Sequence, residues 1–202
     1  MTRVPTVGVA LLLLATLGLS GCDFLISVSG IPNIREMREV TLAPAADFQL
    51  TTRAGQKLEL ADLRGKVVVL TFLDAGCSAD CRAFTGMVKE ASAQMDYYQE
   101  AGRAAFLAVT AAPDKEGALL GGLEGMPQNF YILTGSREDV AQVRAHYEHI
   151  GDETEPARLV LIDTKGRFRA YRTGLELKAA DLRHNIRVLL SEQNLLARPL
   201  CH

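Results

Sequence analysis

Two cysteines, Cys77 and Cys81, are separated by three residues and follow a run of apolar residues. Residues four apart on a helix lie on the same face, about one turn from each other. Two thiolates at that spacing can bind one soft cation such as Cu(I), or they can form a disulfide if their Cβ atoms come within about 4 Å. The spacing predicts a metal-binding or redox-active pair, and two buried structural cysteines are the alternative.

Charged residues near the pair act on the thiols in opposite directions. Close to the N-terminus of a helix, backbone N–H groups and the helix dipole favour the thiolate over the thiol. Arg82 also favours the thiolate, whereas Asp74 and Asp80 oppose it by like charge. The sequence is therefore compatible with both the thiol and the thiolate form of the two cysteines.

The pair lies between a predicted buried strand over residues 67–73 and a predicted helix over 81–100. A nearly continuous apolar strand is expected where both faces of a sheet are covered. A hairpin over 47–60 precedes it. After the helix we expect a strand over 105–110, a loop-rich insertion over 111–129, a strand over 130–133, a helix over 137–148, a hairpin over 159–172 and a helix over 179–196. This order predicts an α/β thioredoxin-like fold with an N-terminal β-hairpin extension and an insertion after the second core strand.

The N-terminus has the pattern of a bacterial lipoprotein signal peptide. Arg3 precedes an apolar segment over residues 7–19, which is shorter than a bilayer-spanning helix requires. Leu19-Ser20-Gly21-Cys22 resembles the lipobox, after which Cys22 carries a diacylglycerol on its sulfur. A signal anchor with an incidental cysteine is the alternative. Asp23 resembles the signal that keeps lipoproteins on the inner membrane, so we expect the extracytoplasmic (periplasmic) face of that membrane.

Composition excludes several functional classes. The chain has 202 residues, of which 48% are hydrophobic and 23% charged, as in ordinary globular proteins. A formal net charge of −2 provides no basic field for nucleic-acid binding.

The motif at Cys22 and the order of the predicted elements divide the chain. We expect a signal peptide over 1–21, a lipidated tether over 22–45, one domain over 46–196, and a frayed tail over 197–202 that contains Cys201 and His202.

Over residues 46–190 the sequence resembles the Sco/SenC family. The matching stretches are Asp47-Phe48-Gln49-Leu50 with Gly55, residues 63–72, the Cys77-x-x-x-Cys81 pair, residues 130–135, and Leu161-Ile162-Asp163 with Gly166. The resemblance implies a thioredoxin-fold protein that delivers copper to the copper A centre of cytochrome c oxidase. It also implies Cu(I) on the cysteine pair, and as partner the copper-bearing oxidase subunit or another copper chaperone.

The family's third copper ligand is a histidine eight residues before the aspartate of the Leu-Ile-Asp strand. Counting back from Asp163 gives Glu155, a harder ligand than imidazole. His149, six residues earlier, is the other candidate for the third ligand. Ser78 and Arg82 stand where the family often has a proline after each cysteine.

Pro156 suggests a second interpretation. It lies within one residue of the position at which thioredoxin-like reductases carry a cis-proline beside their cysteines, and X–Pro is the common site of cis peptide bonds. Glu155 could then move protons during disulfide exchange. An ordinary trans proline at the start of a strand is the alternative.

Three hypotheses follow. The first is a lipid-anchored metallochaperone that assists assembly of cytochrome c oxidase, with Cu(I) on Cys77 and Cys81. The second is an enzyme, a thiol-disulfide oxidoreductase or redox sensor, in which Cys77 attacks and Cys81 resolves the mixed disulfide. The third is an anchored interaction module in which the cysteines have no part.

Overall fold

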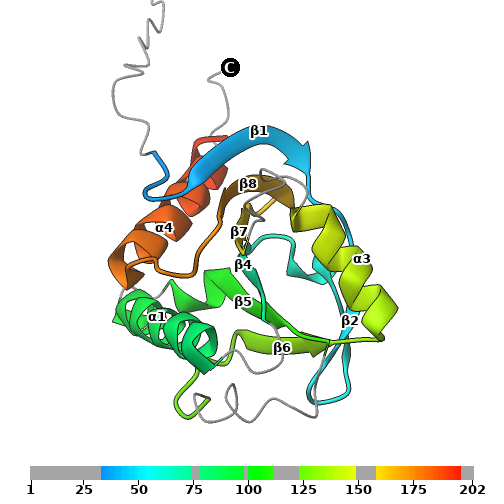
Figure 1. Ribbon diagram of the computed structural model, residues 1–202. Helices are drawn as coiled ribbons and strands as arrows, with labels where there is room; N and C mark the ends of the chain where they lie inside the picture. Colours follow the sequence, from blue (N-terminus) through cyan, green and yellow to red (C-terminus); the bar gives the residue numbers. More distant parts are fainter. Residues whose placement is uncertain (1–32, 74–77, 98–99, 112–122, 149–157, 197–202) are drawn as a thin grey trace, which may run out of the picture. The chain divides into compact units, whose positions relative to one another are not determined.

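The apolar residues that precede the cysteines form a strand within a β-sheet, as the sequence predicted. Within the described residues this sheet has eight strands, in the order β1-β8-β7-β4-β5-β6-β2-β3 (Figure 1). The strands are β1 (Arg38–Pro44), β2 (Gln49–Thr52), β3 (Lys57–Glu59), β4 (Val67–Phe72), β5 (Ala104–Val109), β6 (Phe130–Thr134), β7 (Leu159–Ile162) and β8 (Arg167–Arg172). The computed structural model describes residues 33–73, 78–97, 100–111, 123–148 and 158–196, all within the unit Pro32–His202.

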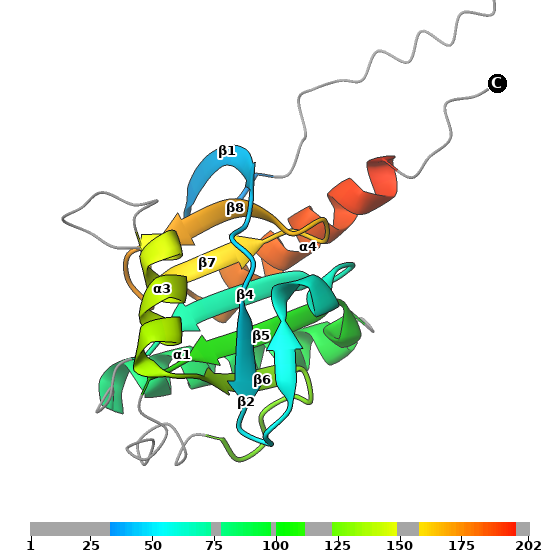
Figure 2. The same ribbon diagram turned by 90° about the vertical axis from the view of Figure 1, so that its right-hand side faces the viewer.

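Strand β4, which leads toward Cys77, lies in the middle of the sheet. It pairs in parallel with β5 and antiparallel with β7, and every residue of β4 is buried. The arrowheads of β4 and β5 point to the same edge of the sheet (Figure 2). Side chains alternate along a strand, so Val67 and Val69 enter one core and Val68 and Leu70 enter the other.

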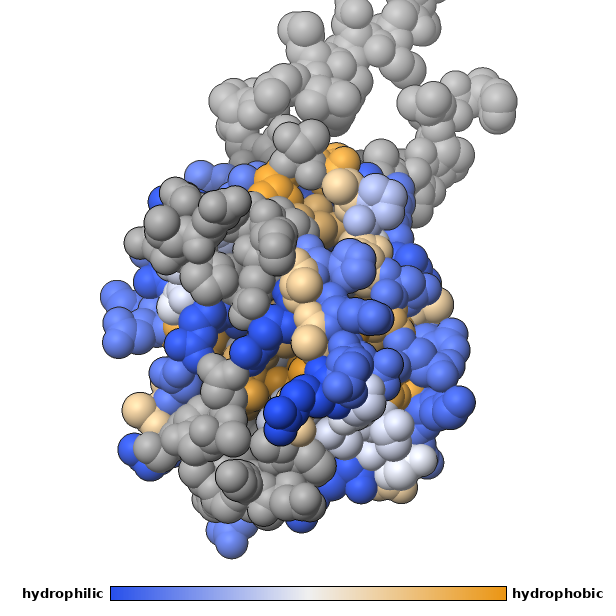
Figure 3. Space-filling model, turned by 45° about the vertical axis from the view of Figure 1, so that its right-hand side comes forward, coloured by the Kyte–Doolittle hydropathy of each residue, from blue (hydrophilic) through white to orange (hydrophobic). Residues whose placement is uncertain are grey.

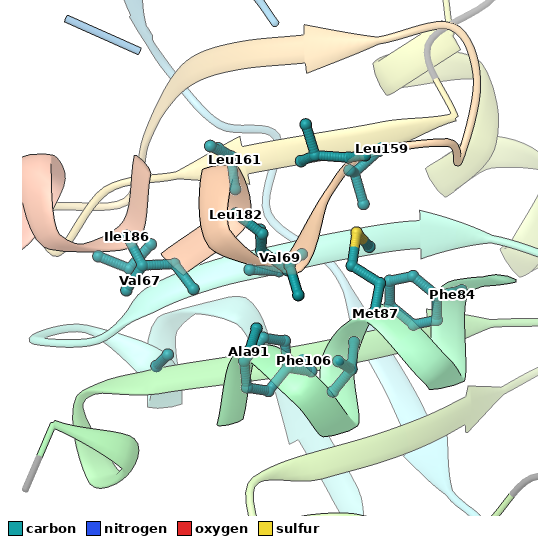
Figure 4. Close-up of a cluster of buried hydrophobic side chains, with 14 of the residues drawn as sticks. Val67, Val69, Phe84, Met87, Ala91, Phe106, Leu159, Leu161, Leu182 and Ile186 are labelled. Carbon is teal, nitrogen blue, oxygen red and sulfur yellow. The ribbon is translucent and has the colours of Figure 1, made fainter. Parts of the chain in front are cut away.

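Helices cover both faces of the sheet. Helices α1 (Ser78–Tyr97) and α4 (Ala179–Leu196) lie on one face, and α3 (Arg137–Glu148) lies on the other (Figure 1). The core under α1 and α4 joins the two helices to β4, β5 and β7. Its members include Phe84, Met87 and Ala91 of α1, Leu182 and Ile186 of α4, and Val67, Val69, Phe106, Leu159 and Leu161 of the strands (Figure 4).

Most predicted elements are present, some with shifted ends. Helices α3 and α4 have the predicted bounds, whereas α1 begins at Ser78, earlier than expected. Residues Leu60–Leu63 form a short 3₁₀ helix, η1, which begins where the predicted hairpin over 47–60 was expected to end. Its buried Leu60 and Leu63 enter the core on the α3 side. A second 3₁₀ helix, η2 (Ala101–Arg103), precedes β5.

Strand β1 was not predicted. Residues 22–45 were expected to be a tether, but Arg38–Pro44 pair with β8 as an edge strand. Before this strand, Ile34 is buried in the core under α1 and α4. The side chain of Asn185 on α4 accepts a hydrogen bond from the Arg35 amide (2.7 Å) and donates one to its carbonyl (2.9 Å). A register shift within β1 interrupts the alternation on which strand prediction depends.

Candidate functional site

Cys81 lies in the first turn of α1, the helix that follows β4. Its exposed fraction is 1%, and its sulfur is part of a disulfide. The predicted partner, Cys77, lies outside the described residues, as do Cys22 and Cys201. Cys81 is therefore buried, as expected of a structural cysteine. It is not a free thiol, however, because its sulfur is part of a disulfide. Disulfide formation was one of the two reactions predicted for the pair, and metal binding was the other.

Burial of Cys81 determines how its disulfide can react. Exchange begins when a thiolate from another molecule attacks one of the two sulfurs in line with the S–S bond. Cys81 is 1% exposed and belongs to the apolar core under α1 and α4, so a reductant does not reach this sulfur directly. Cys81 is therefore not the sulfur that an external thiolate attacks first, which is consistent with the resolving role predicted for it.

An ion pair adjoins Cys81 in the sequence and in space. The Arg158 guanidinium donates a hydrogen bond from Nη2 to Oδ2 of Asp80 over 2.7 Å, and both side chains are partly exposed. Asp80 was expected to oppose the thiolate form of the cysteines. Its carboxylate is instead paired with a cation, while Arg82, the cation named from the sequence, is exposed.

Arg158 is the residue that sequence reasoning missed. Its side chain contacts α1, yet it lies far from the cysteines in the chain, immediately before β7. Its amide donates to the carbonyl of Arg172 (2.8 Å), and its carbonyl accepts from Oγ1 of the fully buried Thr71 in β4 (2.7 Å). Arg158 therefore connects β4, β7, β8 and the first turn of α1 at the edge where β4 ends.

The carboxyl end of α3 reaches the same end of β4 from the other face. Tyr147 is fully buried, its ring lies 6.1 Å from that of Phe72, and its hydroxyl donates to the carbonyl of Ala46 (2.6 Å). Burial raises the pKa of Tyr147, the Asp47 carboxylate raises it further, and Arg64 lowers it. The phenol thus remains a hydrogen-bond donor throughout the physiological pH range.

In the sequence, the predicted third ligands lie between Tyr147 and Arg158. His149, Glu155 and Pro156 belong to residues 149–157, outside the described residues. The chain enters this segment just after Tyr147, beside Phe72, and leaves it at Arg158, beside Asp80. The described residues on either side of the segment, Tyr147 and Arg158, thus both contact the sheet or α1 near the end of β4.

A cavity of about 590 Å³ opens next to the ion pair. Asp80 and Arg158 form part of its wall, and the rest comes from residues 36–38 and 171–176 at the ends of β1 and β8. Figure 3 shows one face of the molecule, where hydrophilic side chains predominate among the described residues and hydrophobic ones are visible between them. The cavity gives a partner molecule a polar contact surface beside the first turn of α1.

Among the described residues, no three His, Cys, Asp or Glu side chains form a group that could hold a metal ion. Of the predicted copper ligands, only Cys81 belongs to those residues. None of the helices in the described ranges is long and apolar enough to cross a membrane.

Comparison with known proteins decides the family. The family model described as SCO1/SenC matches residues 38–191, which include both cysteines of the pair and the segment 149–157. The chain belongs to the SCO1/SenC family. The match begins at Arg38, the first residue of β1, so the family domain includes this edge strand, which lies within the predicted tether. No curated protein matches the sequence.

Three solved structures illustrate the fold shared with the SCO1/SenC family. Bradyrhizobium japonicum ScoI with copper bound is 18% identical, with a TM-score of 0.57, covering 73% of this chain and 100% of that one. BsSco, described with a disulfide switch and as a member of the Sco family of cytochrome c oxidase assembly proteins, is 15% identical, with a TM-score of 0.59, covering 77% and 98%. The thioredoxin domain of a thiol-disulfide oxidoreductase from Bacteroides vulgatus is 22% identical, with a TM-score of 0.54, covering 73% and 96%.

These likenesses confirm the predicted fold class, a thioredoxin-like α/β fold. This SCO1/SenC protein is about as similar in structure to a thiol-disulfide oxidoreductase as to copper-bound Sco proteins. The fold therefore accommodates both the metal-binding and the redox hypothesis, and the chemistry of the cysteine pair must distinguish them.

Proposed function

We propose that this SCO1/SenC protein is a lipid-anchored, extracytoplasmic assembly factor that carries Cu(I) on Cys77 and Cys81 to the copper-bearing subunit of cytochrome c oxidase. The observation that carries the proposal is the disulfide-bonded Cys81 in the first turn of α1, inside the family match. Copper bound to ScoI and the description of BsSco as an oxidase assembly protein support it.

Copper is cargo in this proposal, and only the reduced pair can bind it. Two thiolates suit a soft cation, and either Glu155 or His149 completes the site. A disulfide has no thiolate to offer, so the bond at Cys81 must first be reduced. A dithiol partner achieves this by thiol-disulfide exchange, because it gives up two electrons and two protons and leaves as a disulfide while both cysteines become thiols.

A direct test is titration of the reduced protein with Cu(I) in competition with a chelator. We expect tight one-to-one binding that is lost in Cys77→Ser and in Cys81→Ser. Cys201→Ser is the matched control, because it removes a cysteine from the tail and should leave the affinity unchanged. Weak binding, or binding that survives the loss of either cysteine, would refute the proposal.

The third ligand can be identified by the same titration. Glu155→Gln and His149→Gln each remove one candidate side chain, and only the true ligand should weaken binding when changed. Glu155→His introduces the soft-metal ligand that the family has at this position, and we expect it to raise the Cu(I) affinity. If neither loss matters, the two cysteines bind copper without either residue.

A thiol-disulfide oxidoreductase is the second candidate, and the burial of Cys81 favours it specifically. In each cycle Cys77 would attack a partner disulfide and form a mixed disulfide, and Cys81 would then displace the partner as a dithiol. Incubation of the reduced protein with an oxidised peptide carrying the oxidase subunit's cysteines tests this. Cys81→Ser should trap the mixed disulfide; if it does not, and the wild type reduces no peptide, the enzyme hypothesis fails.

The location and the anchor are part of the proposal and rest on the sequence. Cys22 would be acylated, and membranes from cells expressing Cys22→Ser, washed in high salt, should release the protein that wild-type membranes retain. Mass analysis of the purified native protein would show the added lipid on Cys22. If both cysteines of the pair can be changed to serine without loss of oxidase activity in cells, the protein is an interaction module instead.

A further inference from the structure

A basic hollow of about 350 Å³ lies along α4. Its lining includes Arg35, Arg183, His184 and Arg187, and none of the described residues that line it carries a carboxylate. We propose that this basic hollow binds the phosphate headgroups of anionic phospholipids in the membrane that holds the chain. The inference rests on the lipid anchor of the proposed function and adds a second membrane contact that fixes the orientation of the domain.

The charges around the basic hollow are arranged with the cations outward. Arg35 lies 4.0 Å from Asp181, and their side chains are 57% and 19% exposed. Arg187 lies 3.2 Å from Glu100, and these side chains are 51% and 20% exposed. In both pairs the carboxylate is recessed and the guanidinium faces the solvent, so an approaching surface meets positive charge first.

The third arginine is held against α1. The Nε of Arg183 donates to the side-chain carbonyl of Gln94 on α1 over 3.0 Å. Three guanidinium groups and the imidazole of His184 thus line the basic hollow. Guanidinium groups match phosphate with two parallel hydrogen bonds, and this makes them suited to a phospholipid headgroup.

The chain enters the folded domain beside the basic hollow. The carbonyl of Asn33 lies 3.0 Å from Nε2 of His184, and Asn185 binds the backbone of Arg35 through two hydrogen bonds. Figure 1 shows the start of the described chain lying against α4. The proposed anchor, Cys22, precedes Asn33 by eleven residues, and a chain of that length spans at most about 40 Å.

This arrangement directs the α4 side of the domain toward the membrane. Anionic headgroups attract basic side chains within roughly one Debye length, about 8 Å at physiological salt. The anchored end of the domain carries the basic hollow, so the tether brings the two within reach of each other. Neither Asp80 nor Arg158 lines the basic hollow, so the two sites have different charged residues.

Vesicle sedimentation tests the inference on the chain that starts at residue 22, with Cys22→Ser so that no lipid is attached. This chain contains the whole unit Pro32–His202. We expect it to sediment with vesicles of phosphatidylcholine mixed with phosphatidylglycerol, to ignore phosphatidylcholine alone, and to dissociate in high salt. Loss of one arginine should weaken binding about fivefold, and the double variant Arg35→Gln/Arg187→Gln about 25-fold.

The control is Arg53→Gln/Arg137→Gln, which removes two exposed arginines elsewhere on the domain and should bind like the parent chain. Equal binding by both double variants, or binding to phosphatidylcholine alone, would overturn the inference. So would protection against thermal unfolding by inorganic phosphate without any vesicle binding, because the hollow would then be a site for a soluble anion. Cu(I) titration of Arg35→Gln/Arg187→Gln and lipid analysis of native Cys22 report separately on the proposed function.

Discussion

The ion pairs at the two ends of β7 differ in their burial and in the number of their hydrogen-bond partners. At its start, Arg158 and Asp80 form a single ion pair, with side chains that are 32% and 41% exposed. Just past its end, Asp163 is 3% exposed and accepts hydrogen bonds from the amides of Lys165 and Arg167 and from the guanidinium of Arg167. Arg169 lies 3.6 Å from Asp163 and also binds Glu192 on α4.

The difference separates what holds the fold from what adjoins the chemistry. The Asp163 group fixes the β7–β8 turn and joins the sheet to α4, and its buried carboxylate depends on its partners. The Arg158–Asp80 pair lies beside Cys81, where water screens its charges and side-chain entropy opposes its formation. We therefore expect changes at Asp163 to alter stability and changes at Asp80 to alter mainly the reactivity of the neighbouring disulfide.

The largest effect should follow Asp163→Ala. It removes a buried carboxylate and leaves the guanidinium of Arg167 and two backbone amides without their acceptor, which costs about 3 kcal/mol of unfolding free energy. Urea unfolding followed by circular dichroism measures it. Lys165→Ala is the matched control in the same turn, because Lys165 contributes its backbone and an exposed side chain; it should stay within about 0.5 kcal/mol. Similar losses in both variants would contradict the assignment.

Acid should weaken the same group progressively. Burial alone would raise the pKa of Asp163, but the hydrogen bonds and the charge of Arg167, together with the Lys165 amide, hold the pKa below its ordinary value of 3.8. A carboxylate with a depressed folded-state pKa contributes stability that is complete well above 3.8 and is lost as the pH falls through the folded-state pKa. The stability difference between wild type and Asp163→Asn should therefore shrink below about pH 5; a difference independent of pH would disprove the cause.

An intermediate effect is expected at the other end of β7. Thr71→Val keeps the shape of a fully buried side chain but removes the donor to the Arg158 carbonyl, and an unsatisfied buried carbonyl costs about 1–2 kcal/mol. Chemical denaturation measures it. The same substitution at the half-buried Thr51 in β2 should change the stability by less than about 0.5 kcal/mol. An equal effect at both sites would show that the hydrogen bond to Arg158 does not carry the loss.

The sequence pattern predicted those strands and helices whose apolar residues recur at a regular spacing within the element. Strand β4 is apolar throughout and was found nearly at its predicted bounds, and the apolar stripe of α4 gave that helix its observed ends. Strand β1 was missed because its pairing with β8 and the attachment of Arg35 to Asn185 join residues distant in sequence. The spacing of apolar residues within residues 33–44 therefore does not predict those contacts.

The site divides in the same way. The spacing of Cys77 and Cys81 predicts redox or metal chemistry, and this stays a prediction for the pair; of the two, the structure describes Cys81, whose sulfur is part of a disulfide. Arg158 carried no sequence signal, because an arginine before a strand is common and its contact with Asp80 exists only after β7 has paired with β4. A motif can name the reacting atoms, but the charges that surround them depend on tertiary structure.

The smallest change in stability should come from Arg158→Gln and Asp80→Asn, each within about 1 kcal/mol because the pair is half exposed. Their effects on disulfide reduction should oppose each other. Arg158→Gln leaves the Asp80 charge unpaired and should slow attack by an anionic thiolate such as that of dithiothreitol, whereas Asp80→Asn should hasten it. A unit charge at about 4 Å in water is worth roughly fivefold in rate, and salt should reduce the difference. Arg53→Gln, which removes an exposed arginine elsewhere on the domain, and a neutral phosphine reductant are the controls. If both variants change the rate in the same direction, the pair acts through structure and not through charge.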